Sequence, residues 1–352
     1  MNKLSNSDFR RLFPQDSLVG AEIQKAFGLI KAARSILISS TLTSDGDSIG
    51  AQLGMAALIQ ALRPQDRPKL QIVNESPVPV RYSFLKSTDL IVSFSAWKDS
   101  SSSKSFDLGI VCDGGVERTG KLAPFFDSIP NTILVDHHVV GSEREYNAKI
   151  LDTSASSTCE IVYFLFQEAK IEISPEVAEA LYIGIVFDTG FFKHSITTPK
   201  THFVAADLIS TGIDFSEISD RAILERSQNG QILLRKLMEN MEIHSEGKIV
   251  TSFWSQSDLQ EADAEDGDSE GMINQLYHTR GAEVVVLFVE TGPQELKVSF
   301  RSKGKVNVAD FARSLNPRGG GHVRASGCSL TGSIQDAKAK VVSALEKALV
   351  EL

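Results

Sequence analysis

The chain has 352 residues and a formal net charge of -9, with 42% hydrophobic and 23% charged residues. This length suffices for two domains with cores of their own, and the composition excludes a largely disordered chain. The negative charge argues against a broad basic surface that grips long nucleic acid, although one cleft can still bind a short anion.

Apolar runs stay well below the roughly 18 residues that a membrane span requires, and the first residues lack the apolar core of a signal peptide. We therefore expect a cytoplasmic protein with no membrane partner. The cysteines Cys112, Cys159 and Cys328 are widely spaced and lie in or beside apolar segments, so we expect buried thiols rather than a redox or zinc site.

Strand-like and helix-like segments alternate in the first part of the chain. A helical pattern at residues 16–34 precedes a buried strand at 35–40, and a second helix is expected at 48–62. Further strands are expected at 69–73, 89–93, 107–112 and 132–135. Later helices are expected at 158–169, 175–187 and 199–208. This alternation predicts a mainly parallel sheet.

A long polar helical pattern at residues 215–242 suggests a connection between domains, and we place a helical linker at 214–246. The predicted fold class is α/β, with a larger, mainly parallel-sheet domain at 1–213 and a smaller α/β domain at 247–352. In the smaller domain we expect strands at 248–253, 282–290 and 295–301, and helices at 307–315 and 334–349. The acidic run at 258–270 lacks the ligand spacing of an EF-hand, so we expect a solvated loop there.

Carboxylates stand at the ends of several apolar segments. They are Asp45 and Asp47, Asp113, the triplet Asp136-His137-His138, and Asp188. A parallel sheet brings the carboxyl ends of its strands to one edge, where ligand sites form. Each aspartate alone fits a helix cap or a turn. Together, like charges at one edge predict a bound cation, and carboxylate and imidazole donors suit Mn²⁺ or Mg²⁺.

These motifs, in this order, resemble those of the DHH phosphoesterase superfamily. The glycine-rich Gly319-Gly320-Gly321-His322 resembles the signature of the DHH-associated C-terminal domain. The likeness covers nearly the whole chain and is greatest to the NrnA group of oligoribonuclease and pAp phosphatase proteins. It implies two domains with the active-site cleft between them.

The resemblance also implies two Mn²⁺ ions, with Mg²⁺ as the alternative, that activate water. Asp47, Asp113, His137 and Asp188 would bind one ion, and Asp45 and Asp113 would bind the other. His138 would face the substrate phosphate, and Asp136 would orient the neighbouring imidazole. We therefore take His138 and Asp136 as the catalytic candidates.

A second set of residues is expected to bind substrate. Backbone amides at three glycines can approach an anion, and nearby side chains can add charge-assisted bonds. Glycines alone would equally fit a tight turn, and the resemblance favours substrate binding. The candidates are Arg301, Ser302, Gly319, Gly320, Gly321, His322 and Arg324. Arg118 is either a substrate contact or a solvated residue.

One position departs from the family pattern. Family members usually carry a metal-binding histidine four residues before the first aspartate of the Asp-x-Asp turn, and this chain has Thr41 there. All seven histidines lie at His137 or later. The corresponding metal site would then rely on Asp45, Asp113, water and substrate, or catalysis would be altered or reduced.

The leading functional hypothesis is a Mn²⁺-dependent phosphodiesterase or phosphatase of exoribonuclease type. Its substrates would be short RNA or dinucleotides such as pApA and pGpG, and pAp. A cyclic dinucleotide phosphodiesterase is the close alternative, and a weakened nucleotide-binding sensor is the alternative that Thr41 supports. The acidic chain disfavours long nucleic acid as a partner. A homodimer is compatible with the sequence.

Overall fold

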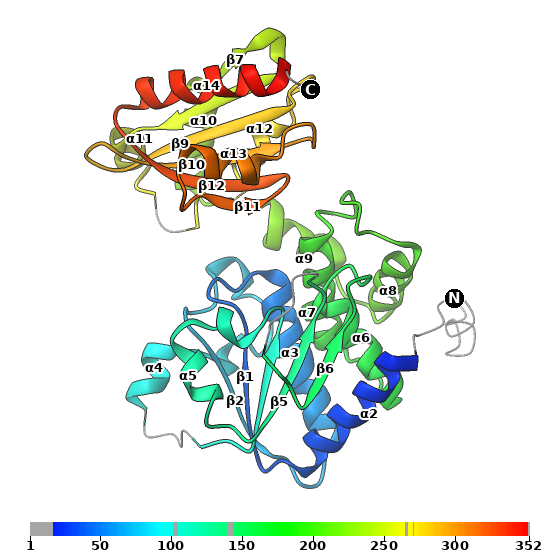
Figure 1. Cartoon of the computed structure of the whole chain (residues 1–352). Helices are drawn as coiled ribbons and strands as arrows, with labels where there is room; N and C mark the ends of the chain where they lie inside the picture. Colours follow the sequence, from blue (N-terminus) through cyan, green and yellow to red (C-terminus); the bar gives the residue numbers. More distant parts are fainter. Residues whose placement is uncertain (1–16, 101–104, 139–143, 265–266, 270, 351–352) are drawn as a thin grey trace. The chain divides into compact units, whose positions relative to one another are not determined.

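The computed structural model describes residues 17–100, 105–138, 144–264, 267–269 and 271–350. It divides into two compact units, Met1–Glu225 and Arg226–Leu352, and each contains one six-stranded sheet (Figure 1). The predicted two-domain α/β fold class is therefore confirmed. The division between the units falls inside the segment predicted as a linker.

The sheet of the first unit is entirely parallel. Its strands are β1 (Ser35–Ser39), β2 (Lys69–Asn74), β3 (Ile91–Ser93), β4 (Leu108–Cys112), β5 (Asn131–Asp136) and β6 (Ala148–Leu151). They lie in the order β3-β2-β1-β4-β5-β6, so the strand order reverses between β1 and β4. Ligands of open parallel sheets bind in the crevice at such a reversal.

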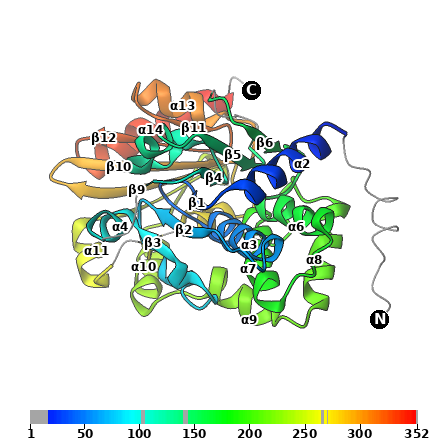
Figure 2. The same cartoon turned by 90° about the horizontal axis from the view of Figure 1, so that it is seen from below.

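Helices cover both faces of this sheet (Figures 1 and 2). The helices of this unit are α2 (Ser17–Ala32), α3 (Gly46–Leu62), α4 (Phe94–Asp99), α5 (Ala123–Phe126), α6 (Thr158–Ala169), α7 (Pro175–Asp188), α8 (Pro199–Ser210) and α9 (Phe215–Ser219). Of these, α8 and α9 pack on α7. Alternate residues of β1 enter different cores, because successive side chains of a strand point to opposite faces. Ile36 and Ile38 pack with α2, α3, α6 and α7. Leu37 packs with Trp97 and Phe126 on the other face.

The second unit has a mixed sheet in the order β11-β12-β10-β9-β8-β7. Its strands are β7 (Glu242–His244), β8 (Ile249–Trp254), β9 (Val284–Gly292), β10 (Glu295–Ser302), β11 (Gly320–His322) and β12 (Ala325–Thr331). The pair β8 and β9 is parallel and the others are antiparallel. Its helices are α10 (Gln228–Glu239), α11 (Gln256–Ala262), α12 (Ile273–Tyr277), α13 (Val308–Leu315) and α14 (Ile334–Val350). Separate hydrophobic cores lie on the two faces of the sheet.

Short helical turns complete the described elements. They are η1 (Val80–Tyr82), η2 (Thr88–Leu90), η3 (Val116–Arg118), η4 (Gly120–Leu122), the π-helical η5 (Asp220–Leu224) and η6 (Ser245–Gly247).

Two of the predicted elements are wrong. The helix expected at residues 215–242 is interrupted between η5 and α10, where Glu225 is extended and the Ser227 hydroxyl caps α10 by accepting from the Gly230 amide. The acidic run at 258–270 begins inside α11, because Ser255 and Asp258 form a capping box. The strands β6, β7, β11 and β12 were not predicted.

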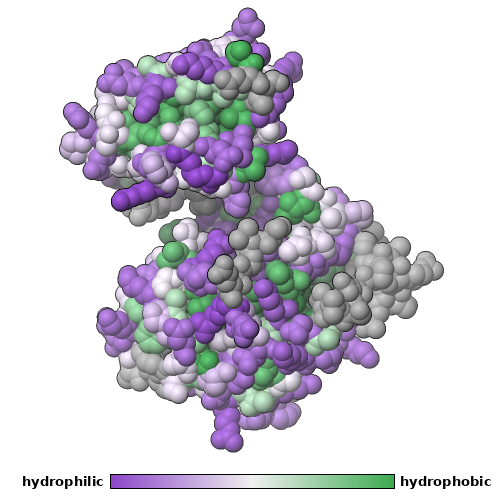
Figure 3. Space-filling model, viewed as in Figure 1, coloured by the Kyte–Doolittle hydropathy of each residue, from purple (hydrophilic) through white to green (hydrophobic). Residues whose placement is uncertain are grey.

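The predicted burial of the cysteines is confirmed: Cys112, Cys159 and Cys328 are buried, free thiols. Hydrophilic residues cover much of the visible face of each unit, with smaller groups of hydrophobic residues between them (Figure 3). Within the described part of the chain, no helix combines the length and the apolar composition that crossing a membrane requires.

Candidate metal centre

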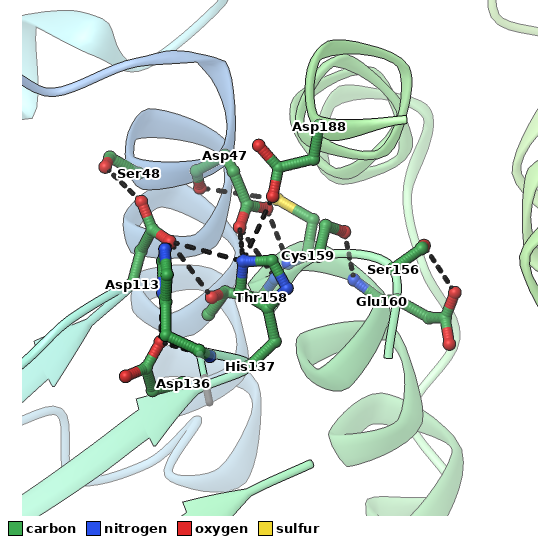
Figure 4. A network of polar contacts seen from close by, with 12 residues as sticks. Asp47, Ser48, Asp113, Asp136, His137, Ser156, Thr158, Cys159, Glu160 and Asp188 are labelled. Carbon is green, nitrogen blue, oxygen red and sulfur yellow. Dashed lines mark hydrogen bonds and ion pairs between the residues drawn. The ribbon is translucent and has the colours of Figure 1, made fainter. Parts of the chain in front are cut away.

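The fold brings most of the acidic motifs of the first unit to one place (Figure 4). Asp47 lies in the first turn of α3, which follows β1, and Asp113 follows β4 directly. His137 comes after β5, and Asp188 is the last residue of α7. Four segments that are distant in the sequence therefore contribute ligand-type side chains to one cluster.

Asp47 is fixed by the amino-terminal end of α6. Its Oδ1 accepts a hydrogen bond of 2.8 Å from the Cys159 amide, and its Oδ2 accepts one of 2.6 Å from the Thr158 amide. The side chain is fully buried. Unpaired amides and the positive end of the helix dipole stabilise a carboxylate at this position. A Cβ on Gly184 of α7 would lie 2.7 Å from Asp47 Oδ1, so glycine gives the carboxylate its space.

Asp113 has a left-handed backbone, with φ of 62°, and is 4% exposed. Ser48 Oγ donates to its Oδ2 at 2.5 Å, and Thr158 Oγ1 donates to its Oδ1 at 3.4 Å. Burial raises the pKa of Asp113 well above its ordinary range, and the charges of Asp47, Asp45 and Asp188 raise it further. The ionised form of this carboxylate is thus disfavoured unless a positive charge lies beside it.

The His137 imidazole lies among three carboxylates. Its Nε2 is 3.1 Å from Asp188 Oδ2, 3.8 Å from Asp113 Oδ1 and 3.9 Å from Asp47 Oδ2. Burial lowers the pKa of His137, but the carboxylates outweigh this effect and raise it to about 9. His137 Nε2 is buried, and its contacts with the described residues do not have the geometry of a hydrogen bond.

These donors fit a divalent cation. The ligand atoms of Asp47, His137 and Asp188 lie within 4.8 Å of one another, and so do those of Asp113, His137 and His138. Burial and the charge of Asp47 raise the pKa of Asp188 to about 7. A cation would neutralise the crowded carboxylates and provide a partner for the buried Nε2, and hard oxygen donors with imidazole suit Mn²⁺ or Mg²⁺.

Asp136 and His138 form a pair beside this cluster. Asp136 Oδ1 lies 2.7 Å from His138 Nδ1 and also accepts a hydrogen bond of 3.1 Å from the His138 amide. Asp136 is 1% exposed, whereas the His138 side chain is 35% exposed. The buried carboxylate therefore fixes the orientation of a histidine that solvent can reach.

Asp45 caps a helix and is not among the closely spaced ligand atoms of the centre. Its Oδ1 caps α3 by accepting from the amides of Asp47 and Ser48. Burial is the main cause that raises its pKa. Neither group of close ligand atoms found among the described residues includes Asp45. Thr41 is buried nearby, and its Oγ1 lies 3.5 Å from Ser48 Oγ.

Arg118 is exposed and lies next to the cluster. Its carbonyl accepts from the Leu42 amide at 2.8 Å. A Cβ on Gly114, the neighbour of Asp113, would lie 3.3 Å from Arg118 Cδ, so the arginine stem packs over this glycine. This position is compatible with either of the two roles considered for Arg118.

The glycine-rich segment of the second unit is part of a β-hairpin. Gly320, Gly321 and His322 pair with β12 in antiparallel register. A Cβ on Gly319 would lie 2.6 Å from the Ala312 carbonyl oxygen, so the packing on α13 requires glycine there. Gly321 has φ of 140°, a backbone conformation that favours glycine. Close packing therefore explains two of the glycines without a ligand.

Cationic side chains accompany this hairpin. His322 and Arg324 are exposed, and the Gly304 position packs against the Arg324 guanidinium. The Arg301 guanidinium is half-buried, and burial lowers its pKa. Within the described part of the chain its only hydrogen bond goes to the Phe300 carbonyl, and no carboxylate pairs with it. Ser302 is buried, and its hydroxyl accepts from the Gly304 amide.

The sequence alone did not identify several residues that shape the centre. The amides of Thr158 and Cys159 bind the Asp47 carboxylate, and the Ser48 hydroxyl binds the Asp113 carboxylate. The capping pattern of Ser157 and Glu160 predicted where α6 begins, but no sequence signal indicated that this helix end faces Asp47. A second missed feature is the left-handed turn of Gly190, Phe191 and Phe192 after Asp188.

Comparisons with known proteins add to this geometry. A model of the DHH family, N-terminal domain, matches residues 35–185, and a model of the DHHA1 domain matches residues 246–351. The chain is 30% identical to the bifunctional oligoribonuclease and PAP phosphatase NrnA of Bacillus subtilis, over 84% of this chain and 89% of that protein. The protein of the same description from Thermus thermophilus is 28% identical, over 89% of this chain and 90% of that protein.

A solved structure has the same fold. The exopolyphosphatase-related protein from Bacteroides fragilis superposes with a TM-score of 0.83 at 24% identity, covering 94% of this chain and 96% of that one. The two-unit architecture is therefore shared with a protein of known structure.

Proposed function

Because the chain belongs to the DHH family, in the group of the bifunctional oligoribonucleases and PAP phosphatases, we propose that it is a metal-dependent phosphoesterase. Its proposed substrates are short oligoribonucleotides and dinucleotides such as pApA and pGpG, and pAp. The cytoplasmic location and the homodimer considered from the sequence stay predictions.

One observation carries this proposal: two buried carboxylates, Asp47 and Asp113, and the partly buried Asp188 lie within 3.9 Å of the buried His137 Nε2, which satisfies no hydrogen bond among the described residues. Asp47, Asp113, His137 and Asp188 would hold one Mn²⁺, and Asp45 and Asp113 would hold a second. A bound cation of this kind lowers the pKa of water and neutralises charge on a phosphate. The raised pKa values of Asp113 and Asp188 support the need for positive charge at this position.

His138 would contact the scissile phosphate. Its Nδ1 is paired with Asp136, so its Nε2 is left to face a ligand. Asp136 would keep the ring in one orientation. The exposure of His138, beside buried ligand-type residues, supports a role at the substrate rather than at the metal.

The second unit carries further proposed substrate-binding residues. An arginine that is half-buried without a carboxylate partner is costly unless an anion binds it, and this supports Arg301 as a phosphate contact. Ser302, the hairpin of Gly319, Gly320 and Gly321, and the side chains of His322 and Arg324 would complete this surface. Arg118 of the first unit is proposed as a further contact.

The experiment is an activity panel with purified protein and MnCl₂. We expect mononucleotides to be released from pApA, pGpG and short RNA, and adenosine monophosphate and phosphate from pAp. Cyclic di-AMP in the same panel tests the close alternative. Binding of the linear substrates without any product would contradict the proposed activity.

A catalytically weakened sensor is the second candidate, and Thr41 supports it. Its hydroxyl donates to the Thr43 carbonyl and lies 3.5 Å from Ser48 Oγ, and Asp45 lies outside the two groups of close ligand atoms. If this hypothesis holds, wild-type turnover is near zero, and Thr41→His should raise both the turnover and the Mn²⁺ affinity. If the wild-type protein already turns over the linear substrates rapidly, the sensor hypothesis fails.

A further inference from the structure

Two buried amide side chains form a reciprocal pair below the acidic turn. Gln52 of α3 donates to Asn74 Oδ1 at 2.7 Å, and Asn74 of β2 donates to Gln52 Oε1 at 2.9 Å. Gln52 is fully buried and Asn74 is 1% exposed. Primary amides are costly to bury, and a core position of this kind is normally apolar. The pair therefore calls for an explanation beyond packing.

The pair extends to the turn that carries Asp45. Asn74 Nδ2 also donates to Ser44 Oγ at 3.1 Å, and the Ser44 hydroxyl donates to the Thr41 carbonyl at 3.3 Å. Ser44 immediately precedes Asp45 and is 7% exposed. A chain of hydrogen bonds thus runs from the core to the loop at residues 41–44.

The position of Asn74 in the sheet makes this contact possible. It is the last residue of β2, which pairs with β1, and the loop in question follows β1. The same loop approaches the metal centre on its other side, because Thr41 Oγ1 lies 3.5 Å from the Ser48 hydroxyl that donates to Asp113. Its conformation is therefore coupled to both Asp45 and Asp113.

We infer that Gln52 and Asn74 are positioning residues for the metal centre. They hold Ser44, and through it the loop of residues 41–44, so that Asp45 and Asp47 present their carboxylates at the carboxyl end of the sheet. This inference rests on the proposed function, since it concerns the same metal centre. Outer residues that orient metal ligands typically change metal affinity about 10- to 100-fold when they are replaced.

The alternative is that the amides only satisfy each other. Four variants separate the two explanations. Ser44→Ala removes the link to the loop and leaves the amide pair intact, and Asn74→Leu breaks both. The double variant Gln52→Leu with Asn74→Leu removes both polar groups, so no amide is left unpaired and much of the lost stability should return. Gln71→Leu is the control on the same strand, because it breaks the partly buried hydrogen bond from Trp97 Nε1 to Gln71 Oε1.

Mn²⁺ affinity is measured by titration calorimetry with MnCl₂, and melting temperature is measured on the same samples. We expect Ser44→Ala and the double variant to bind Mn²⁺ about 10-fold more weakly than the wild type, and Gln71→Leu to bind within twofold of it. The melting temperature of the double variant should exceed that of Asn74→Leu. Wild-type Mn²⁺ affinity in both Ser44→Ala and the double variant would overturn the inference, even if Asn74→Leu fails to fold.

Hydrolysis of pApA by the wild-type protein is measured in parallel. A wild-type protein that binds Mn²⁺ but does not hydrolyse pApA contradicts the proposed function, and the binding comparison still decides the positioning role. If the wild-type protein hydrolyses pApA and the variants keep wild-type Mn²⁺ affinity, the proposed function is supported and the positioning role is contradicted. A wild-type protein that does not bind Mn²⁺ overturns both.

Discussion

At the scale of single residues, Asp113 is under electrostatic strain that a cation would relieve. Its carboxylate is buried near Asp45, Asp47 and Asp188, and these charges and the burial raise its pKa. Asn is nearly isosteric and tolerates the left-handed backbone, with φ of 62°, that Asp113 adopts. Asp113→Asn therefore removes the charge with little backbone strain.

We expect the Mn²⁺ affinity and the hydrolysis rate of Asp113→Asn to be at least about 100-fold below those of the wild type. Without metal at pH 8, we expect the variant to be more stable than the wild type. The gain arises because asparagine has no negative charge that burial and the charges of Asp47, Asp45 and Asp188 would disfavour. A gain of about 1 kcal/mol would raise the melting temperature by about 2 to 4 °C in a unit of this size. Calorimetric scans with and without MnCl₂ measure both effects, and a less stable metal-free variant would contradict the argument.

The titrating groups of the centre also predict a pH dependence. The pKa of His137 is raised from 6.5 to about 9, and that of Asp188 is raised from 3.8 to about 7. Without metal, the stability that these raised values contribute is complete below the ordinary values and is lost as pH rises through about 7 and 9. A ligand must be deprotonated to bind metal, so Mn²⁺ has to displace these protons.

We therefore expect Mn²⁺ affinity to rise between pH 6 and pH 9, by about tenfold per pH unit for each proton displaced. Titration calorimetry in buffers of different ionisation enthalpy counts the protons released. The number should fall as pH rises, because Asp188 and then His137 lose their protons before metal binds. Affinity that does not change over this range would show that neither group is a ligand.

At the scale of elements, the turn after α7 is held in an uncommon conformation. Gly190, Phe191 and Phe192 have φ values of 53°, 62° and 61°, and left-handed phenylalanine is unfavourable. His194 Nδ1 lies 2.8 Å from the Asp188 carbonyl oxygen, and a Cβ on Gly190 would lie 2.6 Å from the His194 ring. The turn therefore follows directly on Asp188, the last residue of α7 and a proposed metal ligand, and contacts its carbonyl oxygen through His194.

Gly190→Ala should destabilise the protein by about 1 to 3 kcal/mol and weaken Mn²⁺ binding, because it adds backbone strain and displaces His194. Gly212→Ala is the control: Gly212 has φ of 94°, but a Cβ there would meet nothing within 4 Å. It should lose stability through backbone strain alone and keep its Mn²⁺ affinity. Equal effects of the two variants on thermal unfolding and Mn²⁺ titration would contradict a role of this turn in the centre.

The elements also explain how far the sequence allows prediction. Ser157 and Glu160 predicted a helix at residues 158–169, and α6 begins at Thr158 because the Ser157 hydroxyl accepts from the Glu160 amide. The Glu160 carboxylate, however, accepts from Ser156 and Thr201 instead of the Ser157 amide. Local patterns indicate where a helix begins, whereas the partners of its side chains depend on segments that only folding brings together.

The same distinction holds for the metal centre. Asp45, Asp47, Asp113 and the triplet at residues 136–138 follow apolar strands, so a parallel sheet predicted that they would gather at one edge. The amides of Thr158 and Cys159 that bind Asp47 lie 111 and 112 residues away from it in the chain, and no spacing rule connects them. The glycine-rich hairpin was predicted as an anion loop, but packing on Ala312 also requires one of its glycines.

At the scale of the whole molecule, the two units have separate hydrophobic cores and carry different proposed functional residues. The close groups of ligand atoms found among the described residues lie in the first unit, whereas Arg301 and the glycine-rich hairpin lie in the second. The hydrophobic cores of the two units share no residues. A metal should therefore stabilise the first unit alone, and a nucleotide that contacts both should also affect the second.

Hydrogen exchange followed by mass spectrometry tests this division. MnCl₂ alone should slow exchange in peptides that cover residues 41–48 and the start of α6, because the amides of Thr158 and Cys159 bind Asp47. Adding pAp should slow exchange in β10 and in the hairpin of β11 and β12, since Arg301 and Arg324 would then have an anionic partner. Asp113→Asn should abolish the Mn²⁺ effect. Protection by Mn²⁺ in the second unit, or no effect of pAp there, would contradict the assignment of the metal ligands to the first unit and of further substrate contacts to the second.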